Sequence, residues 1–367
     1  MGSTGPIVVV GGGHAGAQLC AGLAAAGQGH RVHLVCEEAE VPYHRPPLSK
    51  SFVKSPLESL QLHRPRPWFD DSGITLHLGD PAIAIDRMRR KVRLKSGEEL
   101  GYEHLVLATG TRARLLPHLP ERLMNVAVLR TAEDAIRMRD VLATVADLTV
   151  LGGGFIGLEI ASTARALGKN VCVLDSAPRL LTRSISPELA EHVQRTHQDS
   201  GIDVRLGVAV GSFDVVGNRL ASLKVDGVVR LIDTLVLAIG AVPEHALANE
   251  AGLECDNGVV VDEHMQTSDP AILAIGDCTS FPEPTTGRRM RLESVQNAND
   301  QAKAAVATMT GNRQPYRAVP WFWSEQGTLR LQMAGLMPPE GVRHRRLGTT
   351  PGSFSILHYV GDRMTCV

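Results

Sequence analysis

Short apolar runs that end at glycines set the pattern of this chain. The first run, residues 7–10, leads into GGGHAG and then into a small-residue stretch at 17–26. This succession predicts a strand, a tight turn and a helix. In such a unit Gly11 permits the turn, Gly13 lets a pyrophosphate approach the backbone, and Gly16 lets the helix pack against the strand.

A second apolar run supports the same interpretation. Residues 31–36 predict a second strand, and Glu37 follows it, about twenty residues beyond the turn. A carboxylate there can accept hydrogen bonds from ribose hydroxyls, while the helix N-terminus favours the phosphates. We therefore predict that a dinucleotide binds at the turn that begins at Gly11.

The whole pattern recurs about 140 residues later. An apolar run at 147–151 precedes GGGFIG at 152–157, a helix extends through Ala166, and the run 170–174 ends at Asp175. A repeat of strand, turn, helix and acid is far more specific than either copy alone. The sequence thus predicts two dinucleotide sites.

Other patterns complete the expected organisation. Residues 41–50 contain three prolines, which predict a shaped loop that holds Arg45, Ser49 and Lys50 in place; a plain surface linker is the alternative. Further strands are expected at 74–78, 82–85, 91–94, 100–102, 104–108, 203–206, 234–239, 259–261, 272–275, 329–333 and 353–359, and a helix at 297–309.

These elements predict an α/β fold with two Rossmann-like dinucleotide-binding domains and a C-terminal α+β sheet domain. Breaks rich in Arg, Pro and Gly suggest where the chain crosses between domains. The predicted limits are 1–110 with 241–314 for a first, discontinuous domain, 111–240 for the second and 315–367 for the third.

Composition excludes several classes of partner. The net charge of −1 indicates neither nucleic-acid nor membrane binding. Because no apolar run of eighteen residues occurs, we expect a cytoplasmic protein. We also expect a monomer or weak dimer. The six cysteines show no metal-type or CxxC spacing, so we expect no metal site and no internal redox disulfide.

The motifs together resemble a known family: the FAD-dependent, NAD(P)H-linked ferredoxin reductases that serve bacterial P450 and Rieske oxygenases, within the pyridine nucleotide-disulfide oxidoreductase superfamily. The resemblance covers essentially the whole chain. Its motifs are GGGHAG, PYHRPPLSK, LATG, LRTAEDA, GGGFIGLE, MQTSDPAILAIGDC, RLESVQNANDQA and PWFWS. The chain departs from the family at Glu244, where asparagine is usual, and at Val367, beyond which the family continues for roughly another helix.

The resemblance implies FAD on the first unit and NAD(P)H, with NADH preferred, on the second. The FAD site is expected to comprise Gly11, Gly13, His14, Ala15, Gly16, Glu37, Arg45, Lys50, Ile83, Ala108, Thr109, Gly110, Arg130, Gly276, Asp277 and Val295. The NAD site is expected to comprise Gly152, Gly154, Phe155, Ile156, Gly157, Asp175 and Gly240.

Three residues are expected to act in catalysis. The family places Lys50 and Glu159 beside the flavin, although a purely structural ion pair is the alternative. Trp323 is either the point where electrons leave or a core anchor of the last domain. His14 is interpreted as an exposed loop residue rather than a catalytic one.

The resemblance implies a flavoprotein that passes electrons from NADH through FAD to an acidic [2Fe–2S] ferredoxin or a rubredoxin. The arginine runs Arg87–Lys91, Arg288–Arg291 and Arg343–Arg346 are candidate docking surfaces for it. Alternatives are a reductase of a small acceptor such as a quinone or monodehydroascorbate, and a redox-gated binding protein similar to apoptosis-inducing factor.

Overall fold

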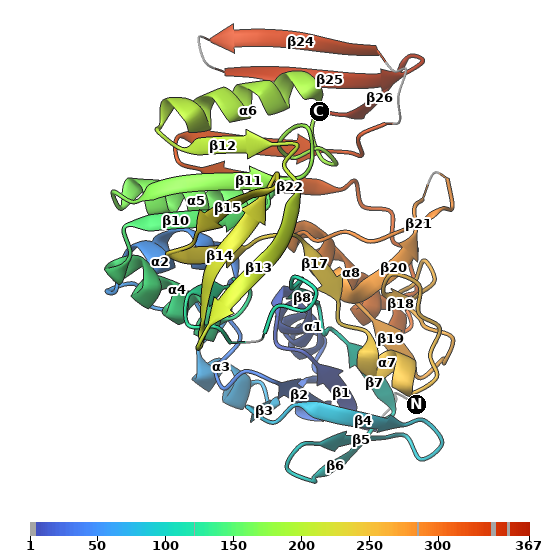
Figure 1. Cartoon of the computed structure of the whole chain (residues 1–367). Coiled ribbons are helices and arrows are strands. Elements are labelled where there is room, and N and C mark those ends of the chain that lie inside the picture. The colour runs from blue at the N-terminus through green and yellow to red at the C-terminus, as the bar shows by residue number, and fades with distance from the viewer. Residues whose placement is uncertain (1–4, 121, 285, 339–342, 351–352) are drawn as a thin grey trace. The chain divides into compact units, whose positions relative to one another are not determined.

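The chain folds into two compact units, each assembled from distant segments. The computed structural model describes residues 5–120, 122–284, 286–338, 343–350 and 353–367, and Figure 1 labels its elements. Unit 1 comprises Met1–Arg45, Leu60–Arg112 and Val242–Pro320. Unit 2 comprises Pro46–Ser59, Ala113–Ala241 and Trp321–Val367.

Unit 1 is built on a five-stranded parallel sheet of order β19-β7-β1-β2-β3. Its strands are β1 (Ile7–Val10), β2 (Val32–Cys36), β3 (Thr75–Leu78), β7 (His104–Leu107) and β19 (Ile272–Ala274). The chain runs outward from β1 in one direction and returns to its other side with β7. Ligands of doubly wound sheets bind at this point of reversal, beyond the carboxyl ends of the strands.

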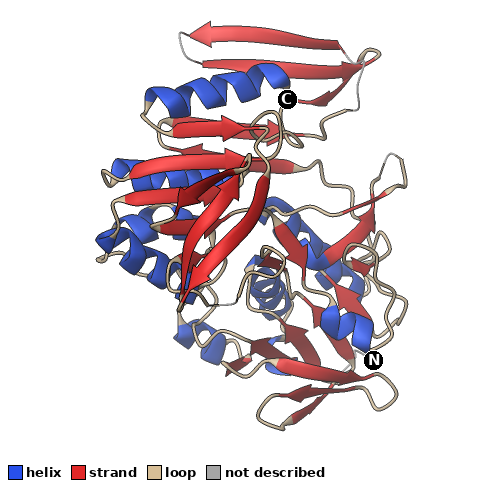
Figure 2. Cartoon of the chain, in the orientation of Figure 1, coloured by secondary structure: helices blue, strands red, loops and turns tan. Residues whose placement is uncertain are grey.

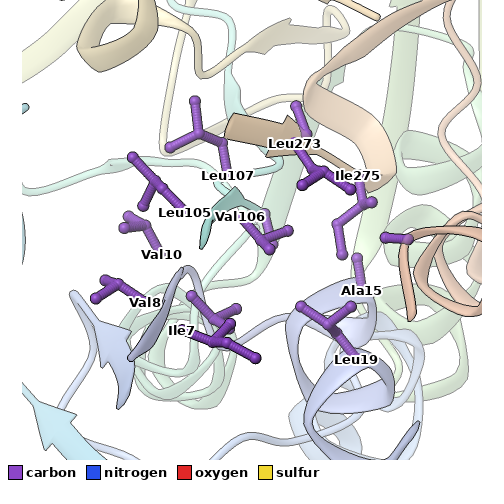
Figure 3. Packing of buried hydrophobic residues seen from close by; sticks show 14 of the residues in the cluster. Ile7, Val8, Val10, Ala15, Leu19, Leu105, Val106, Leu107, Leu273 and Ile275 are labelled. Carbon is purple, nitrogen blue, oxygen red and sulfur yellow. The ribbon is translucent and has the colours of Figure 1, made fainter. Parts of the chain in front are cut away.

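The core of unit 1 is packed around β1, whose four residues are all buried. Figure 3 shows Val10 of this strand beside Leu105 of β7, the strand with which β1 pairs. A strand covered on both faces needs a continuous apolar run, which explains why the sequence does not alternate here. Helices α1 (His14–Ala25) and α8 (Val295–Met309) pack against one another in the same unit.

Smaller elements complete unit 1. Strands β4 (Ala82–Asp86), β5 (Lys91–Leu94) and β6 (Glu99–Gly101) form the expected antiparallel excursion, and β18 (Val259–Val260), β20 (Thr279–Pro282) and β21 (Arg289–Met290) form a second small sheet. Short helices are η1 (Gly29–Arg31), α3 (Arg66–Asp71), α7 (Ala246–Glu250) and η3 (Gly276–Cys278). The chain crosses between the units within β8 (Thr111–Ala113) and β17 (Ala241–Pro243).

Unit 2 repeats the parallel sheet, with strand order β12-β11-β10-β16-β9. The strands are β9 (Val126–Ala127), β10 (Asp147–Leu151), β11 (Asn170–Asp175), β12 (Asp203–Leu206) and β16 (Thr234–Leu237). Strand β10 occupies the place that β1 has in unit 1, because β11 pairs on one side of it and β16 on the other. The predicted internal repeat is therefore present in the fold.

The remaining elements of unit 2 include helices, a β-meander and the C-terminal strands. The helices are η2 (Pro46–Ser49), α2 (Ser51–Lys54), α4 (Ala132–Thr144), α5 (Phe155–Ala166) and α6 (Pro187–Asp199). The meander is β13 (Val210–Val216), β14 (Arg219–Val225) and β15 (Val228–Leu231). The C-terminal strands are β22 (Trp321–Gln326), β23 (Leu329–Ala334), β24 (Arg343–Thr350), β25 (Ser353–Val360) and β26 (Arg363–Cys366).

Sequence patterns missed the elements that carry little apolar signal. Helices α4 and α6 and the meander β13–β15, visible in Figure 2, were not predicted. Most of β13 and β15 is exposed or half-buried, so their apolar alternation is weak. No helix in the described ranges is both long and apolar enough to span a membrane.

Candidate functional site

The turn after β1 holds its backbone in a shape that only glycine accommodates. Gly11 has φ +115°, and a Cβ atom placed on it would lie 2.2 Å from the carbonyl oxygen of Ala108. A Cβ on Gly16 would lie 1.9 Å from the oxygen of Gly11. At Gly13, in contrast, no neighbouring atom of the described residues lies within 4 Å of such a Cβ. Two glycines are thus required by the fold, and one leaves an open face.

The turn after β10 has the same geometry. Gly152 has φ +116°, and a Cβ there would lie 2.2 Å from the oxygen of Ala238. A Cβ on Gly157 would meet the Gly152 oxygen at 2.1 Å, and Gly154 again faces open space within the described chain. The two turns are therefore equivalent residue by residue.

Both turns lead into helices that can receive an anion. Helices α1 and α5 begin directly after Gly13 and Gly154. Neither has a side-chain cap or an acidic residue in its first turn, as far as the chain is described. Their first N–H groups and their dipoles favour a phosphate group. The open glycine faces and these N–H groups fit the pyrophosphate of a dinucleotide in each unit.

The acids at the ends of the second strands are not equivalent. The Gly11 N–H donates to the Val35 oxygen and the Gly152 N–H to the Leu174 oxygen, both at 2.8 Å. Cys36 and Asp175 therefore occupy matching positions, because each follows the accepting residue. Glu37 lies one residue further on, where unit 2 has Ser176.

Asp175 also supports its own turn. Its carboxylate accepts hydrogen bonds from the Gly153 N–H at 2.6 Å and the Ala177 N–H at 2.8 Å. Arg179 donates to the carbonyl oxygens of Thr182 and Ile185 and so stabilises the following loop. The carboxylate keeps acceptor capacity for further hydrogen bonds, since two oxygens offer about four lone-pair sites.

Several other residues expected to bind FAD lie beyond the strand ends of unit 1. Ala108, Thr109 and Gly110 follow β7 directly, and Gly276 and Asp277 open η3 after β19. Gly276 has φ +80°, and a Cβ there would lie 2.9 Å from the Ala15 side chain. The switch point therefore brings the LATG and GDC segments to the same sheet edge as the glycine turn.

The remaining members of the predicted FAD set are spread more widely. Arg45 pairs with Glu38 at 2.7 Å, and Val295 is the first residue of α8. Ile83 lies on β4 and is 44% exposed. Lys50 and Arg130 belong to unit 2. Their binding to FAD stays a prediction.

Glu244, which replaces the family's asparagine, is held from two directions in unit 1. Its side chain pairs with Arg112 at 3.1 Å, and its carbonyl oxygen accepts from the Thr109 hydroxyl at 2.5 Å.

Lys50 and Glu159 form an ion pair in unit 2. The Lys50 Nζ lies 2.8 Å from Glu159 Oε2, and the side chains are 22% and 5% exposed. The proline-rich segment holds the lysine, because Nζ also donates to the Pro46 oxygen at 3.1 Å. The pair is thus built from residues about 110 positions apart and is nearly removed from water.

Glu159 is the centre of a larger buried network that sequence reasoning missed. Its Oε2 also accepts from the Ser49 hydroxyl at 2.5 Å, and its Oε1 accepts from the Ser324 hydroxyl at 2.8 Å. Gln326 donates to Ser324 at 3.1 Å and contacts His197 Nε2 at 2.9 Å. Burial lowers the pKa of His197, against a smaller opposing effect of the Gln326 hydrogen bond. Both carboxylate oxygens of Glu159 thus accept hydrogen bonds, as a buried charge requires.

Strand β22 presents different chemistry on its two faces. Its even-numbered residues Phe322, Ser324 and Gln326 contact the helices: Phe322 packs on Phe155 with ring centroids 4.5 Å apart. The odd-numbered Trp321 and Trp323 stack on one another at 5.1 Å. Trp321 is exposed and Trp323 is half-buried. The alternation in WFWSEQ, a period of two, was the signal that could have revealed the buried polar face.

His14 corrects one expectation. It is the first residue of α1 and is buried, whereas the sequence suggested an exposed loop residue. It also lies with His44 and His63, so that one possible ligand atom from each falls within 4.8 Å of the others. No local sequence pattern predicted this cluster, because His14 is distant in sequence from His44 and His63.

The cysteines are free thiols. All six are unpaired in the structure, with Cys20, Cys36, Cys278 and Cys366 buried. Burial raises the pKa of Cys36 to about 12, and burial likewise raises the pKa of Cys20 and Cys278. Such thiols stay protonated at neutral pH and are poor nucleophiles.

Carboxylates neutralise part of the arginine runs. Arg87 pairs with Asp269, Arg291 with Glu293 and Arg346 with Glu188. The side chains of Arg343 and Arg345 lie outside the described part of the chain. Arg89 pairs with Asp86 at 3.8 Å, while Arg90 and Arg288 are exposed in unit 1.

Two parallel sheets with equivalent glycine turns define an α/β protein with two dinucleotide-binding units. The chain belongs to the pyridine nucleotide-disulphide oxidoreductase family, whose model matches residues 5–302. Residues 321–367 match the reductase C-terminal family. The predicted fold class and family are confirmed, and the chain is an oxidoreductase.

Individual relatives are similar over almost the whole chain. Rhodocoxin reductase from Rhodococcus erythropolis is 42% identical over 98% of this chain and 84% of its own length. The crystal structure of the ferredoxin reductase for the CYP199A2 system from Rhodopseudomonas palustris has a TM-score of 0.94 and 38% identity, covering 99% of this chain and 90% of that one. A covalent putidaredoxin reductase–putidaredoxin complex matches with a TM-score of 0.92 and 38% identity, covering 99% and 89%.

The glycine geometry predicts that two alanine substitutions in unit 2 affect different properties: Gly154→Ala nucleotide binding, and Gly152→Ala the free energy of unfolding. We expect Gly154→Ala to change unfolding free energy by less than about 0.5 kcal/mol, because its Cβ meets open space and its φ of −84° suits any residue. It should still weaken nucleotide binding about tenfold or more, since the methyl group enters the expected pyrophosphate path. Gly152→Ala should cost about 3 kcal/mol or more through strain and overlap. Urea unfolding and NADH titration measure both; unchanged NADH affinity in Gly154→Ala would contradict the assignment.

The Glu159 network predicts strong coupling between Lys50 and Glu159. Removing one partner of a buried pair leaves an uncompensated charge, so Lys50→Met or Glu159→Gln should each cost about 2 to 3 kcal/mol. The double variant should lose clearly less than the sum. A double-mutant cycle by urea unfolding measures the coupling. The exposed Glu191–Arg195 pair of α6 is the matched control, with coupling below about 0.5 kcal/mol; equal coupling in both pairs would contradict the burial argument.

Proposed function

We propose that this protein is a flavoprotein reductase that takes a hydride from NADH and passes single electrons to a [2Fe–2S] ferredoxin or a rubredoxin that serves an oxygenase. The observation that carries the proposal is the pair of equivalent glycine turns in one chain. Similarity over almost the full length to rhodocoxin reductase and to a putidaredoxin reductase–putidaredoxin complex supports the kind of acceptor.

In this proposal unit 1 holds FAD and unit 2 holds NADH. The N–H groups that open α1 and α5 bind the two pyrophosphates, next to the open faces of Gly13 and Gly154. Glu37 and Asp175 accept hydrogen bonds from the adenosine riboses. The LATG and GDC segments of unit 1 lie at the same sheet edge as its turn, which supports FAD there rather than on unit 2.

FAD, when bound, supplies an acceptor of two electrons that can release them singly. The protein's residues position and stabilise charge. Lys50, which the family resemblance assigns to the flavin, carries an ammonium group fixed at 2.8 Å from Glu159. A cation held in this way stabilises negative charge that develops on reduction and needs no reorganisation.

The thiols support an external acceptor. An internal electron acceptor would need a cysteine pair. Here all six cysteines are free, and burial raises the pKa of Cys20, Cys36 and Cys278. We assign electron exit to the face of β22 that carries Trp321 and Trp323. Trp321 is 40% exposed, and its stacking on Trp323 gives a continuous aromatic surface.

The acceptor can be tested directly. We expect NADH oxidation by the full chain to be faster with a [2Fe–2S] ferredoxin than with a quinone or monodehydroascorbate at equal concentration. Turnover with an acidic ferredoxin should fall above about 0.1 M salt, where the screening length is about 10 Å. The fall should be modest, because carboxylates already neutralise Arg87, Arg291 and Arg346.

Other outcomes of that experiment point elsewhere. Faster turnover with a quinone would identify a small-acceptor reductase. A reduced flavin–NAD⁺ complex that persists in air, with slow turnover on every acceptor, would favour a redox-gated binding protein. Ferredoxin turnover that is constant with salt would contradict docking through the exposed cations Arg90 and Arg288.

Asp175 predicts a preference for NADH over NADPH. A carboxylate about 4 Å from a 2′-phosphate is repelled by about 4 kcal/mol at an effective dielectric constant near 20. Screening should leave about 2 kcal/mol, or roughly thirtyfold in kcat/KM. Arg179 offers little compensation, because its guanidinium already donates to two carbonyl oxygens.

The substitution must allow for the turn that Asp175 supports. Asp175→Asn removes the charge and keeps one acceptor for the Gly153 N–H, so it is preferable to Asp175→Ala. We expect the NADH/NADPH ratio of kcat/KM to fall severalfold in Asp175→Asn. Glu37→Gln, an equivalent charge loss in unit 1, is the control and should leave that ratio unchanged. A wild-type ratio near one, or the same ratio in Asp175→Asn, would show that Asp175 does not select the nucleotide.

A further inference from the structure

Three imidazoles converge in unit 1 at the edge of the first glycine turn. His14 is the first residue of α1, and His44 lies in the proline-rich segment 41–50. His63 lies between that segment and α3. Their ring centroids are 5.3 Å apart for His14 and His44, 4.5 Å for His14 and His63, and 3.9 Å for His44 and His63. One ring nitrogen from each lies within 4.8 Å of the other two.

The backbone fixes two of the three rings beside each other. The His44 N–H donates to the Gln61 oxygen at 2.8 Å, and the His63 N–H donates to the Pro42 oxygen at 2.9 Å. These bonds flank an antiparallel bridge between the residues that precede the two histidines. The third ring is carried by the N-terminus of α1, which is itself fixed by the glycine turn. The cluster is therefore held by backbone structure on every side.

The rings also have the chemistry of metal ligands. The Nε2 atom of His63 is buried and has no hydrogen-bond partner among the described residues. Neutral imidazole is the form that binds metal ions. The nearby Arg45 is paired with Glu38, which moderates its repulsion of a cation.

We propose that His14, His44 and His63 form a binding site for one divalent transition-metal ion of the Zn²⁺ type, with three nitrogen ligands and at least one open position. Zinc binds imidazole nitrogen at about 2.0 to 2.1 Å, so tetrahedral ligands lie about 3.4 Å from each other. The observed nitrogen separations are 4.8 Å or less, so the rings must approach one another by up to about 1.4 Å to reach that geometry. Imidazole ligands suit Zn²⁺, Cu²⁺ and Ni²⁺ and disfavour Mg²⁺ and Ca²⁺.

Such an ion would connect the proline-rich segment to the glycine turn. Two ligands come from the bridged segments and the third from α1, so the ion would join parts of unit 1 that are distant in sequence. Because a metal ion binds the folded arrangement and not the unfolded chain, it should stabilise unit 1. The inference does not depend on which electron acceptor the protein uses.

Zinc titration of the full chain tests the site. The chelator-treated protein is titrated with ZnCl₂ by calorimetry, and metal content is measured after dialysis; we expect one tightly bound Zn²⁺ per chain and a raised unfolding temperature. His44→Gln and His63→Gln should each weaken Zn²⁺ binding at least about tenfold. Losing a residue that only hydrogen-bonds to a ligand already costs about that much in metal affinity, and losing the ligand itself costs more. Wild-type protein that binds no stoichiometric Zn²⁺ would overturn the proposal whether or not the variants fold.

The chain offers a matched control in a second pair of histidines. His33 and His77 lie with ring nitrogens 3.2 Å apart on neighbouring strands of the same unit. His77→Gln should leave Zn²⁺ stoichiometry, affinity and the zinc-dependent rise in unfolding temperature unchanged. Binding that survives in His63→Gln, or that disappears in His77→Gln instead, would assign the ion to another place and overturn the proposal.

Discussion

Each dinucleotide unit depends on a close approach between two backbone segments. The carbonyl oxygen of the residue after β7 in unit 1, or after β16 in unit 2, lies 2.2 Å from the Cβ position of the first glycine of the turn. A side chain at Gly11 or Gly152 would push the turn away from the strand end and move the helix N-terminus with it. The anion site is then lost, because its donors are the first N–H groups of that helix.

Glu159 has a comparable role inside unit 2. One carboxylate accepts from Ser49 and Lys50 of the proline-rich segment and from Ser324 of β22. A buried charge is stable only when hydrogen-bond partners satisfy it. The Glu159 carboxylate of α5 therefore requires the proline-rich segment and β22 to stay in position. The two readings of Lys50, as structural partner and as catalytic cation, are therefore compatible: the same contacts that stabilise the pair also position the ammonium.

The repeated units could be predicted because their chemistry is local in sequence. A glycine needed for a positive φ, and an apolar run needed for a strand covered on both faces, each appear as a short continuous pattern in the sequence. The Glu159 network and the histidine cluster leave none, since they arise when His44 and His63, or Glu159 and Ser324, are brought together by topology. His14 was misjudged for the same reason: its position in a turn indicated exposure, and only the packing of residues from elsewhere in unit 1 buries it.

The offset between Glu37 and Asp175 has an evolutionary meaning. If the two units descend from one duplicated ancestor, the first and last glycines of each turn stayed in place because the fold leaves no room there for a side chain. The last position of the second strand was free to diverge. Cys36 fills it with a thiol whose Sγ lies 2.6 Å from the Cβ position of Gly12, while the Asp175 carboxylate there accepts a hydrogen bond from the Gly153 N–H. The duplicated gene could thus specialise each copy for a different nucleotide by changes at a strand end, without altering the scaffold that both copies share.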